Sequence, residues 1–216
     1  MVKNLSMDAY EQIKNMIFTM QLRPGESISE EKISELLNCS RTPVREALRQ
    51  LANEGLVQIH PQRQAKVSSY DKDHIRHIGV VRLEQDILSG RLAVYYGSNA
   101  DFLSLREYGD CCEKAEQAGN LHIRVKNDIA FHLQIAYIGK NEILIRNQEN
   151  LYQQIYIIEY QLAEEIGQEK TLKQISHHQE IIQALIERDF DRYQEYIIKH
   201  IQIFYDIDPN YLRLLK

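Results

Sequence analysis

The sequence predicts a mainly α-helical protein made of two domains. Only nine glycines and four prolines occur among 216 residues, which favours long helices joined by short connections. Strand-like patterns are confined to residues 56–70, and helical periodicity resumes after them. The polar stretch SSYDKD lies at this change and is the predicted linker. We therefore expect a small mixed domain over residues 1–70 and an all-helical bundle over residues 71–216.

Composition excludes several classes of protein. No apolar run approaches the roughly 20 residues of a membrane-spanning helix, and the N-terminal stretch lacks the continuous apolar core of a signal peptide. The three cysteines, Cys39, Cys111 and Cys112, fit no disulfide framework. These features predict a cytoplasmic protein that does not enter a membrane.

Three helices followed by a β-hairpin are predicted for the first domain. The segment AYEQIKNMIFTMQL has apolar residues at helical spacing and ends at the Pro24-Gly25 break. Ser29 and Ser40 are suitable N-caps for the second and third helices, because a serine side chain can accept a hydrogen bond from the first turn. The segments LVQIH and AKVSSY resemble two strands around the turn PQRQ. This order of elements is that of a winged helix-turn-helix.

Arginines recur at every fourth residue of the third predicted helix, with no acid aligned beside them. One interpretation is a solvated helix face, which is common on generic helices. The other is DNA binding, because arginine can bond to the guanine edge in the major groove and can also pair with phosphates. The first domain has nine Lys and Arg against eight Asp and Glu, a charge of only +1, whereas the rest has 17 against 23, a charge of −6. Specific contacts with DNA therefore explain the row of arginines better than a general electrostatic attraction of the domain to DNA. The candidate contact residues are Arg41, Thr42, Arg45, Arg49, Arg63 and Lys66.

The first domain also resembles a known family. Residues 10–67 are similar to the DNA-binding domain of the GntR family of bacterial transcription regulators, through the blocks LRPGE, SRTPVREAL and EGLV. The resemblance implies that Arg41, Thr42, Arg45 and Arg49 lie against DNA, with Arg63 on the wing. The family usually has glycine at the wing tip, where Gln64 stands in this sequence, so a side-chain contact would replace the close backbone approach. Two recognition helices on two half-sites imply a homodimer.

The second domain is predicted to be a series of helices carrying inward-facing histidines. The expected helices cover residues 72–96, 98–118, 122–138, 141–165, 169–188, 190–205 and a short tail. Asp128 and His132 are four residues apart on one of them, while His178 and His200 lie on the apolar faces of two others. Histidines of this kind are often satisfied core residues. A metal ion would also satisfy all four side chains, and nitrogen with carboxylate oxygen suits Zn, Ni, Fe or Mn.

The second domain resembles the helical effector domain of the FadR subgroup, within the GntR family. In the metal-binding branch of that subgroup, an Asp-x-x-x-His pair and two later histidines coordinate the ion, which implies the ligand set Asp128, His132, His178 and His200. The stretch VRLEQDILSGRLA is similar to the opening helix of the branch, in which an arginine faces the ligand cavity. That arginine corresponds to Arg82, which would clamp a small carboxylate. The alternative for Arg82 is a surface ion pair with Asp86, four residues away.

The function expected from these features is that of a ligand-responsive transcription regulator. It would bind double-stranded operator DNA as a homodimer, and a small carboxylate effector with a divalent transition metal would control that binding. The alternative is a metal-dependent hydrolase that carries a DNA-binding module. We expect no enzyme, because the sequence has no evident nucleophile motif or phosphate-cradling glycine loop. A third interpretation gives the helical body a purely structural role.

Overall fold

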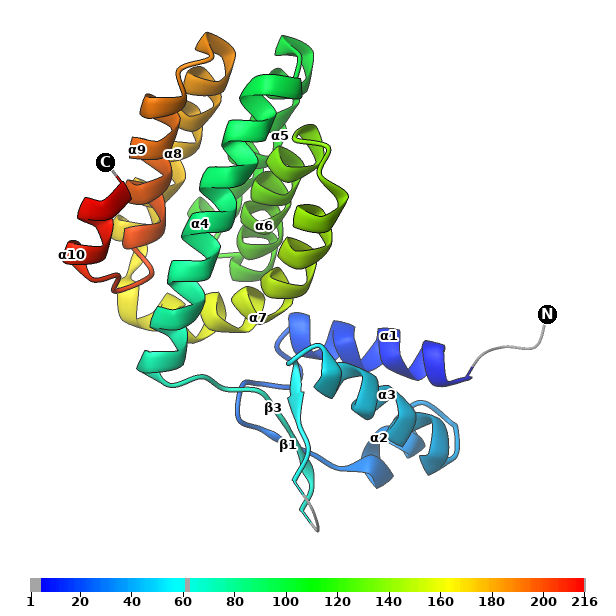
Figure 1. Cartoon of the computed structure of the whole chain (residues 1–216). Coiled ribbons are helices and arrows are strands. Elements are labelled where there is room, and N and C mark those ends of the chain that lie inside the picture. The colour runs from blue at the N-terminus through cyan, green and yellow to red at the C-terminus, as the bar shows by residue number, and fades with distance from the viewer. Residues whose placement is uncertain (1–4, 61–62, 216) are drawn as a thin grey trace. The chain divides into compact units, whose positions relative to one another are not determined.

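The computed structural model describes residues 5–60 and 63–215 and has the mainly α-helical class that the sequence predicts (Figure 1). The chain divides into two compact units, Met1–Ser69 and Tyr70–Lys216. In the described residues, no helix combines the length and the apolar character that crossing a membrane requires.

The first unit is a three-helix domain with a small antiparallel sheet. Its elements are α1 (Leu5–Phe18), β1 (Ser27–Ile28), α2 (Glu30–Leu36), α3 (Arg41–Asn53), β2 (Val57–Gln58) and β3 (Ala65–Val67). The strand order is β1-β3-β2, and Ile28 pairs with Ala65. The strand β1 was not predicted, because two residues close before a helix show no alternation. Pro61 and Gln62 of the predicted turn lie outside the described residues.

Local sequence explains the helices of this unit. Ser29 caps α2 by accepting a hydrogen bond from the Lys32 N–H, as predicted, whereas Ser40 occupies the cap position of α3 without a side-chain hydrogen bond. The apolar face of α3 is buried and packs against α1, so the opposite face of α3 is left to solvent. Gly55 follows α3 with a φ of +79°, a left-handed conformation that glycine adopts without strain.

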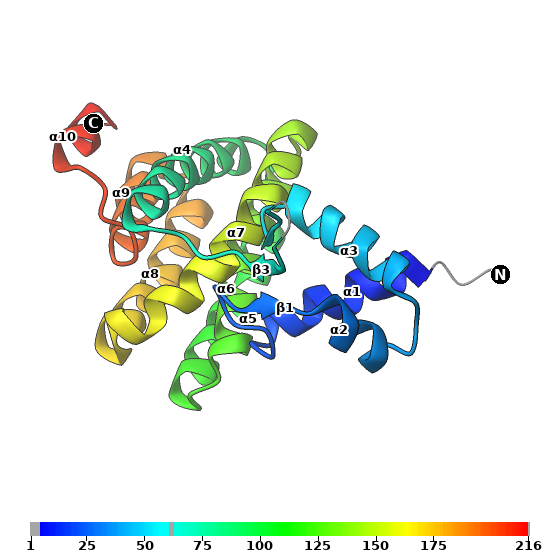
Figure 2. The same cartoon turned by 90° about the horizontal axis from the view of Figure 1, so that it is seen from below.

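The second unit is an all-helical bundle (Figures 1 and 2). Its elements are α4 (Lys72–Tyr96), α5 (Asn99–Gln117), α6 (Leu121–Ile138), α7 (Glu142–Ile166), α8 (Gln168–Glu187), α9 (Phe190–Gln202), α10 (Pro209–Leu212) and a 3₁₀ turn (Arg213–Leu215). Their bounds lie within three residues of the predicted ranges. The stretch QQIYIIEYQL, rich in Ile and Tyr, is helical as predicted, since it lies inside α7.

Packing in this unit centres on α4, α6 and α8. The helix α6 packs against α4, α5 and α7, while α8 packs against α5 and α9. Where α4 meets α9, a Cβ added at Gly90 would lie 1.9 Å from Cε1 of Tyr193, so only glycine permits this approach. Tyr193 also donates a hydrogen bond to the backbone carbonyl of Asp86 at 2.9 Å. The arrangement brings residues of α4, α6, α8 and α9 into one interior.

Candidate functional site

The candidate DNA-contacting residues of the recognition helix share its exposed face. Arg41, Thr42, Arg45 and Arg49 are all exposed along α3. Acids of α2 do lie beside this row, contrary to what the spacing on α3 alone suggested. Arg45 Nε is 2.6 Å from Glu30 Oε2, and Arg41 is paired with Glu31. Helix-local spacing could not reveal these pairs, because they join residues on two different helices.

The described part of the wing carries the other two candidates. Arg63 and Lys66 are exposed, and Lys66 lies on β3 between the buried residues Ala65 and Val67. Gln64 is also exposed beside Arg63. The alternation along β3 therefore directs Lys66 toward solvent.

The four candidate metal ligands converge in the interior of the helical unit. Asp128 and His132 come from α6, His178 from α8 and His200 from α9, and each is at most 1% exposed. One ligand atom from each lies within 4.8 Å of the others. Residues up to 72 positions apart in sequence thus meet at one point. His177, the neighbour of His178, is also buried but lies outside this group.

The contacts of His132 and His200 favour Nε2 lone pairs that point into the cluster. Nδ1 of His200 lies 3.1 Å from the backbone carbonyl of Gln174, which can only accept, so the ring proton belongs on Nδ1. Nδ1 of His132 lies 3.2 Å from a carboxylate oxygen of Asp86, an ion-pair distance without hydrogen-bond geometry, and the negative charge favours the same tautomer. The two Nε2 atoms then face each other at 3.0 Å, and the Gln174 side-chain amide, 3.1 Å from Nε2 of His200, can donate to that atom. A cation in the cluster would also satisfy the lone pair of His132.

Burial sets the charge states of the cluster. It lowers the pKa of His178 and, more strongly, that of His200, so these rings are neutral at pH 7. Burial alone would raise the pKa of Asp128, but the hydrogen bond from His178, with 3.1 Å between Nε2 and Oδ1, holds it well below the usual range. Neutral imidazoles and an ionised carboxylate are the forms that bind metal. The donor set therefore fits a divalent transition ion, of a kind that ligand types do not specify.

Arg82 is fully buried on α4 and pairs with three acids. Its guanidinium nitrogens lie 3.6 Å from Asp86, 3.3 Å from Asp128 and 3.0 Å from Glu159. The pair with Asp86 exists, as the alternative interpretation of Arg82 expected, but it is buried and not on the surface. Its partner Asp128 is one of the clustered ligands, so Arg82 borders the cluster directly.

Asp86 supports the cluster from behind. Its Oδ1 accepts hydrogen bonds from the Gln148 amide at 2.8 Å and the Tyr152 hydroxyl at 2.9 Å, while its Oδ2 lies 3.2 Å from His132 Nδ1. These contacts fix the carboxylate, and the carboxylate in turn orients the His132 ring. Neither Gln148 nor this role of Tyr152 could be predicted from the sequence, because both depend on the packing of α7 against α4.

Two further buried charges were missed by the sequence analysis. Glu159 of α7 is 0% exposed, and its Oε2 lies 3.3 Å from Nη1 of Arg124 on α6. Arg124 also reaches Glu116, with 3.4 Å between Nε and Oε2. A single acid inside the apolar run IYIIEYQL was the available signal for Glu159. Its two oxygens thus contact two different arginines, Arg82 and Arg124.

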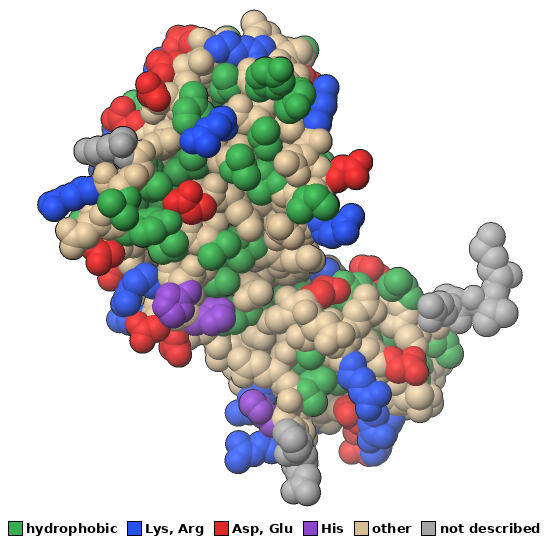
Figure 3. Space-filling view, viewed as in Figure 1, with side chains coloured by type: hydrophobic (Ala, Val, Ile, Leu, Met, Phe, Trp, Pro, Cys, Tyr) green, Lys and Arg blue, Asp and Glu red, His purple; other side chains and the backbone are tan. Residues whose placement is uncertain are grey.

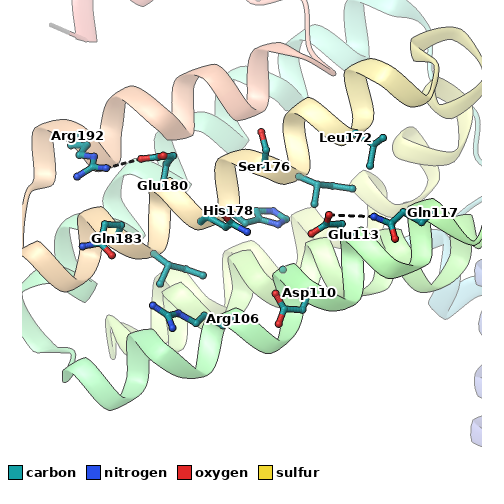
Figure 4. Close-up of a pocket in the computed structure, with 14 residues that line it drawn as sticks. Arg106, Asp110, Glu113, Gln117, Leu172, Ser176, His178, Glu180, Gln183 and Arg192 are labelled. Carbon is teal, nitrogen blue, oxygen red and sulfur yellow. Dashed lines mark hydrogen bonds and ion pairs between the residues drawn. The ribbon is translucent and has the colours of Figure 1, made fainter.

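A cleft of about 780 Å³ between α5 and α8 approaches the cluster (Figure 4). His178 forms part of its wall, together with charged residues such as Arg106, Asp110 and Glu113. Gly109 of α5 packs closely on His178, since an added Cβ would lie 3.4 Å from the His178 Cβ. One ligand of the cluster therefore lines the cleft, although the residue is only 1% exposed.

Both units match described families. Residues 5–67 match the model of the bacterial regulatory proteins of the gntR family, and residues 80–203 match that of the FCD domain. The chain belongs to the GntR family of bacterial transcriptional regulators, with an FCD domain as its C-terminal part.

A relative of the same class agrees with this assignment, and two solved structures share the fold. The chain is 26% identical over 193 residues to the HTH-type transcriptional repressor RspR of Escherichia coli K12, covering 89% of this chain and 84% of the relative. Its fold is similar to that of E. coli McbR/YncC, with a TM-score of 0.79 at 23% identity over 94% of this chain and 95% of the other. A GntR regulator structure from Rhodococcus sp. RHA1 has a TM-score of 0.80 at 18% identity, covering 91% and 93%.

Proposed function

We propose that this regulator binds operator DNA as a homodimer, under the control of a small carboxylate effector and a divalent metal. The observation that carries the proposal is the convergence of three imidazole nitrogens and one carboxylate, next to a buried arginine, in a chain that has a GntR DNA-binding domain. Each part of the proposal has its own support and its own test.

DNA would be read by the exposed face of α3. In helix-turn-helix proteins the N-terminal half of this helix enters the major groove, which is where Arg41 and Arg45 lie. Their pairs with Glu31 and Glu30 join side chains that are 35–63% exposed, and exposed pairs contribute at most about 1 kcal/mol. Phosphates and base edges could therefore displace these acids at little cost. Arg49 and Thr42 would add further DNA contacts on α3, and Arg63 and Lys66 would contact DNA from the wing.

The metal would be held by Asp128, His132, His178 and His200. A bound Zn, Ni, Fe or Mn ion offers a Lewis-acid position for a carboxylate oxygen of the effector. The protein residues neutralise the ion, exclude water and orient the rings through Asp86 and the Gln174 carbonyl. Arg82, next to Asp128, would clamp the effector carboxylate through charge-assisted hydrogen bonds.

The homodimer would form through α4. Val81, Leu88 and Tyr95 are 46%, 39% and 80% exposed and are seven residues apart, so they form one apolar stripe. A seven-residue spacing is that by which two helices pair, and a two-fold axis would place the same stripe of both chains together. Figure 3 shows hydrophobic side chains gathered on the face that α4 crosses in Figure 1.

The test begins by selecting bound sequences from a pool of random double-stranded DNA. Affinities for selected and scrambled DNA are then measured at one salt concentration, with metal-loaded and with chelator-treated protein. We expect two symmetric half-sites, a preference for selected DNA of about 10³-fold or more, and an affinity that depends on metal. Equal affinity for both DNAs would refute specific binding. A chelator-treated protein with unchanged melting and DNA affinity would instead remove only the metal from the proposal.

A further inference from the structure

Glu159 lies in the interior between two arginines that come from different helices. Its Oε1 is 3.0 Å from Nη1 of Arg82 on α4, and its Oε2 is 3.3 Å from Nη1 of Arg124 on α6. All three side chains are at most 1% exposed. Each guanidinium group contacts a different oxygen of the same carboxylate. This arrangement is suited to binding a carboxylate ligand.

We infer that Arg82 and Arg124 form the carboxylate subsite of the effector site proposed above, on which this inference rests. Glu159 is the resident occupant of that subsite, and an effector carboxylate replaces it. Arg82 reaches the metal-ligand candidate Asp128 at 3.3 Å, so a carboxylate held by the two arginines lies beside the cluster. Arg124 is thereby a specificity-determining residue, although it lies outside the set predicted from the sequence.

Charge explains why the effector carboxylate would replace the Glu159 carboxylate and would not bind beside it. The buried arginines Arg82 and Arg124 already face four ionisable acids, Asp86, Glu116, Asp128 and Glu159. A second carboxylate beside Glu159 would bring two like charges together in a buried space, which disfavours ionisation of both. An anionic ligand therefore enters this position only when the side chain of Glu159 leaves it.

Two aromatic residues link the subsite to a second cleft, of about 680 Å³. Phe204 and Tyr205 form part of the wall of this cleft. The guanidinium carbon of Arg82 lies 5.6 Å from the Tyr205 ring centroid, and that of Arg124 lies 5.5 Å from the Phe204 centroid. The same two residues therefore contact the arginines and line the cleft, and an effector that enters from this side would have to displace their rings.

The helix that carries Glu159 also forms hydrogen bonds with Tyr70, the first residue of the helical unit. Two positions further along α7, the Gln161 side chain accepts a hydrogen bond from the Tyr70 N–H at 3.1 Å and donates one to the Tyr70 carbonyl at 3.3 Å. Tyr70 directly follows the DNA-binding unit in the chain. Release of Glu159 would loosen α7 at this anchor, so effector binding would be communicated to the start of the unit.

Chemical rescue tests the subsite. Glu159→Ala removes the resident carboxylate and the methylene next to it, which leaves a space about the size of acetate between the arginines. Thermal melting of this variant is measured against acetate, with uncharged acetamide as the ligand control. Glu116→Ala is the matched protein control, because it removes a carboxylate from the same Arg124 at a position that is 14% exposed. Exchange of the Tyr70 amide with deuterium is measured in parallel.

We expect Glu159→Ala to melt several degrees lower than the parent and to recover most of this loss with acetate, in a saturable manner. Acetamide should have no effect, Glu116→Ala should not respond, and the faster Tyr70 exchange of Glu159→Ala should slow again with acetate. Equal responses to acetate and acetamide, or an equal response of Glu116→Ala, would overturn the subsite. An unaltered Tyr70 exchange would overturn its link to α7.

The outcome remains decisive if Glu159→Ala does not fold unaided. Refolding from urea is then compared with and without acetate, and a folded fraction that acetate raises no more than acetamide refutes the subsite. Neither metal nor DNA takes part in these measurements. A failed rescue would therefore refute the subsite without refuting DNA or metal binding. Conversely, failure of the DNA or metal experiments would not change the result of the rescue.

Discussion

Removing the charge of Asp86 should weaken metal binding although every candidate ligand is still present. Asp86→Asn keeps the size of the side chain but presents a weaker acceptor, or an amide N–H, to His132 Nδ1 at 3.2 Å. The ring then loses the partner that favours its proton on Nδ1 and its lone pair toward the cluster. Loss of such a supporting carboxylate typically costs about 10- to 100-fold in metal affinity. This factor corresponds to roughly 1.4–2.7 kcal/mol.

The assay is a competition between protein and a chromogenic chelator for Zn²⁺, at pH 7 and fixed salt. Glu84→Gln is the matched control, because it neutralises an exposed acid on the same helix, two residues away from Asp86. We expect the parent and Glu84→Gln to agree within about twofold and Asp86→Asn to fall 10-fold or more. Asp86→Asn with the zinc affinity of the parent would refute the supporting role. A parent that fails to compete would refute the metal site itself.

Three further predictions concern DNA binding, packing and assembly. Arg45→Ala should weaken binding to selected DNA and reduce the preference for the correct base by about 1–3 kcal/mol. Lys66→Ala should mainly reduce the slope of log affinity against log salt concentration by about one unit. Both effects are measured by salt titrations of fluorescence anisotropy, and an equal loss of affinity for random DNA would exclude base reading by Arg45. Gly90→Ala should destabilise the helical unit by about 1–3 kcal/mol in urea unfolding, because the new Cβ overlaps Tyr193; unchanged stability would mean that α9 shifts freely. Leu88→Lys should yield monomers by light scattering if α4 forms the dimer, whereas a dimer that persists would assign the interface elsewhere.

Local patterns were sufficient to predict most of the fold. Helical periodicity over residues 72–96 matches α4 in full, and Ser29 caps α2 as its position suggested. Asp128 and His132 could be paired from the sequence alone because a four-residue spacing aligns side chains on any helix. Periodicity also placed His178 and His200 on buried faces. The meeting of the four candidate ligands at one point depends on tertiary packing, and only the resemblance to the family indicated it.

Interactions between helices were not predictable in the same way. The pairing of Arg45 with Glu30 depends on how α2 lies beside α3, and no spacing within either helix records it. Glu159 is the clearest case, because a charged residue in an apolar run can as well be exposed as buried. Its two arginine partners lie 77 and 35 residues away in sequence. Only packing of α4, α6 and α7 brings them together.

The origin of the cluster in α6, α8 and α9 has a mechanical consequence. Asp128 and His200 are 72 positions apart in the chain, so an ion shared by them would act as a removable cross-link across most of the bundle. Such a link restrains the α8–α9 hairpin, which follows α7 through Gly167, and its loss would free that hairpin before the rest of the unit. Metal availability would then set how long the protein survives proteases as well as when it binds DNA.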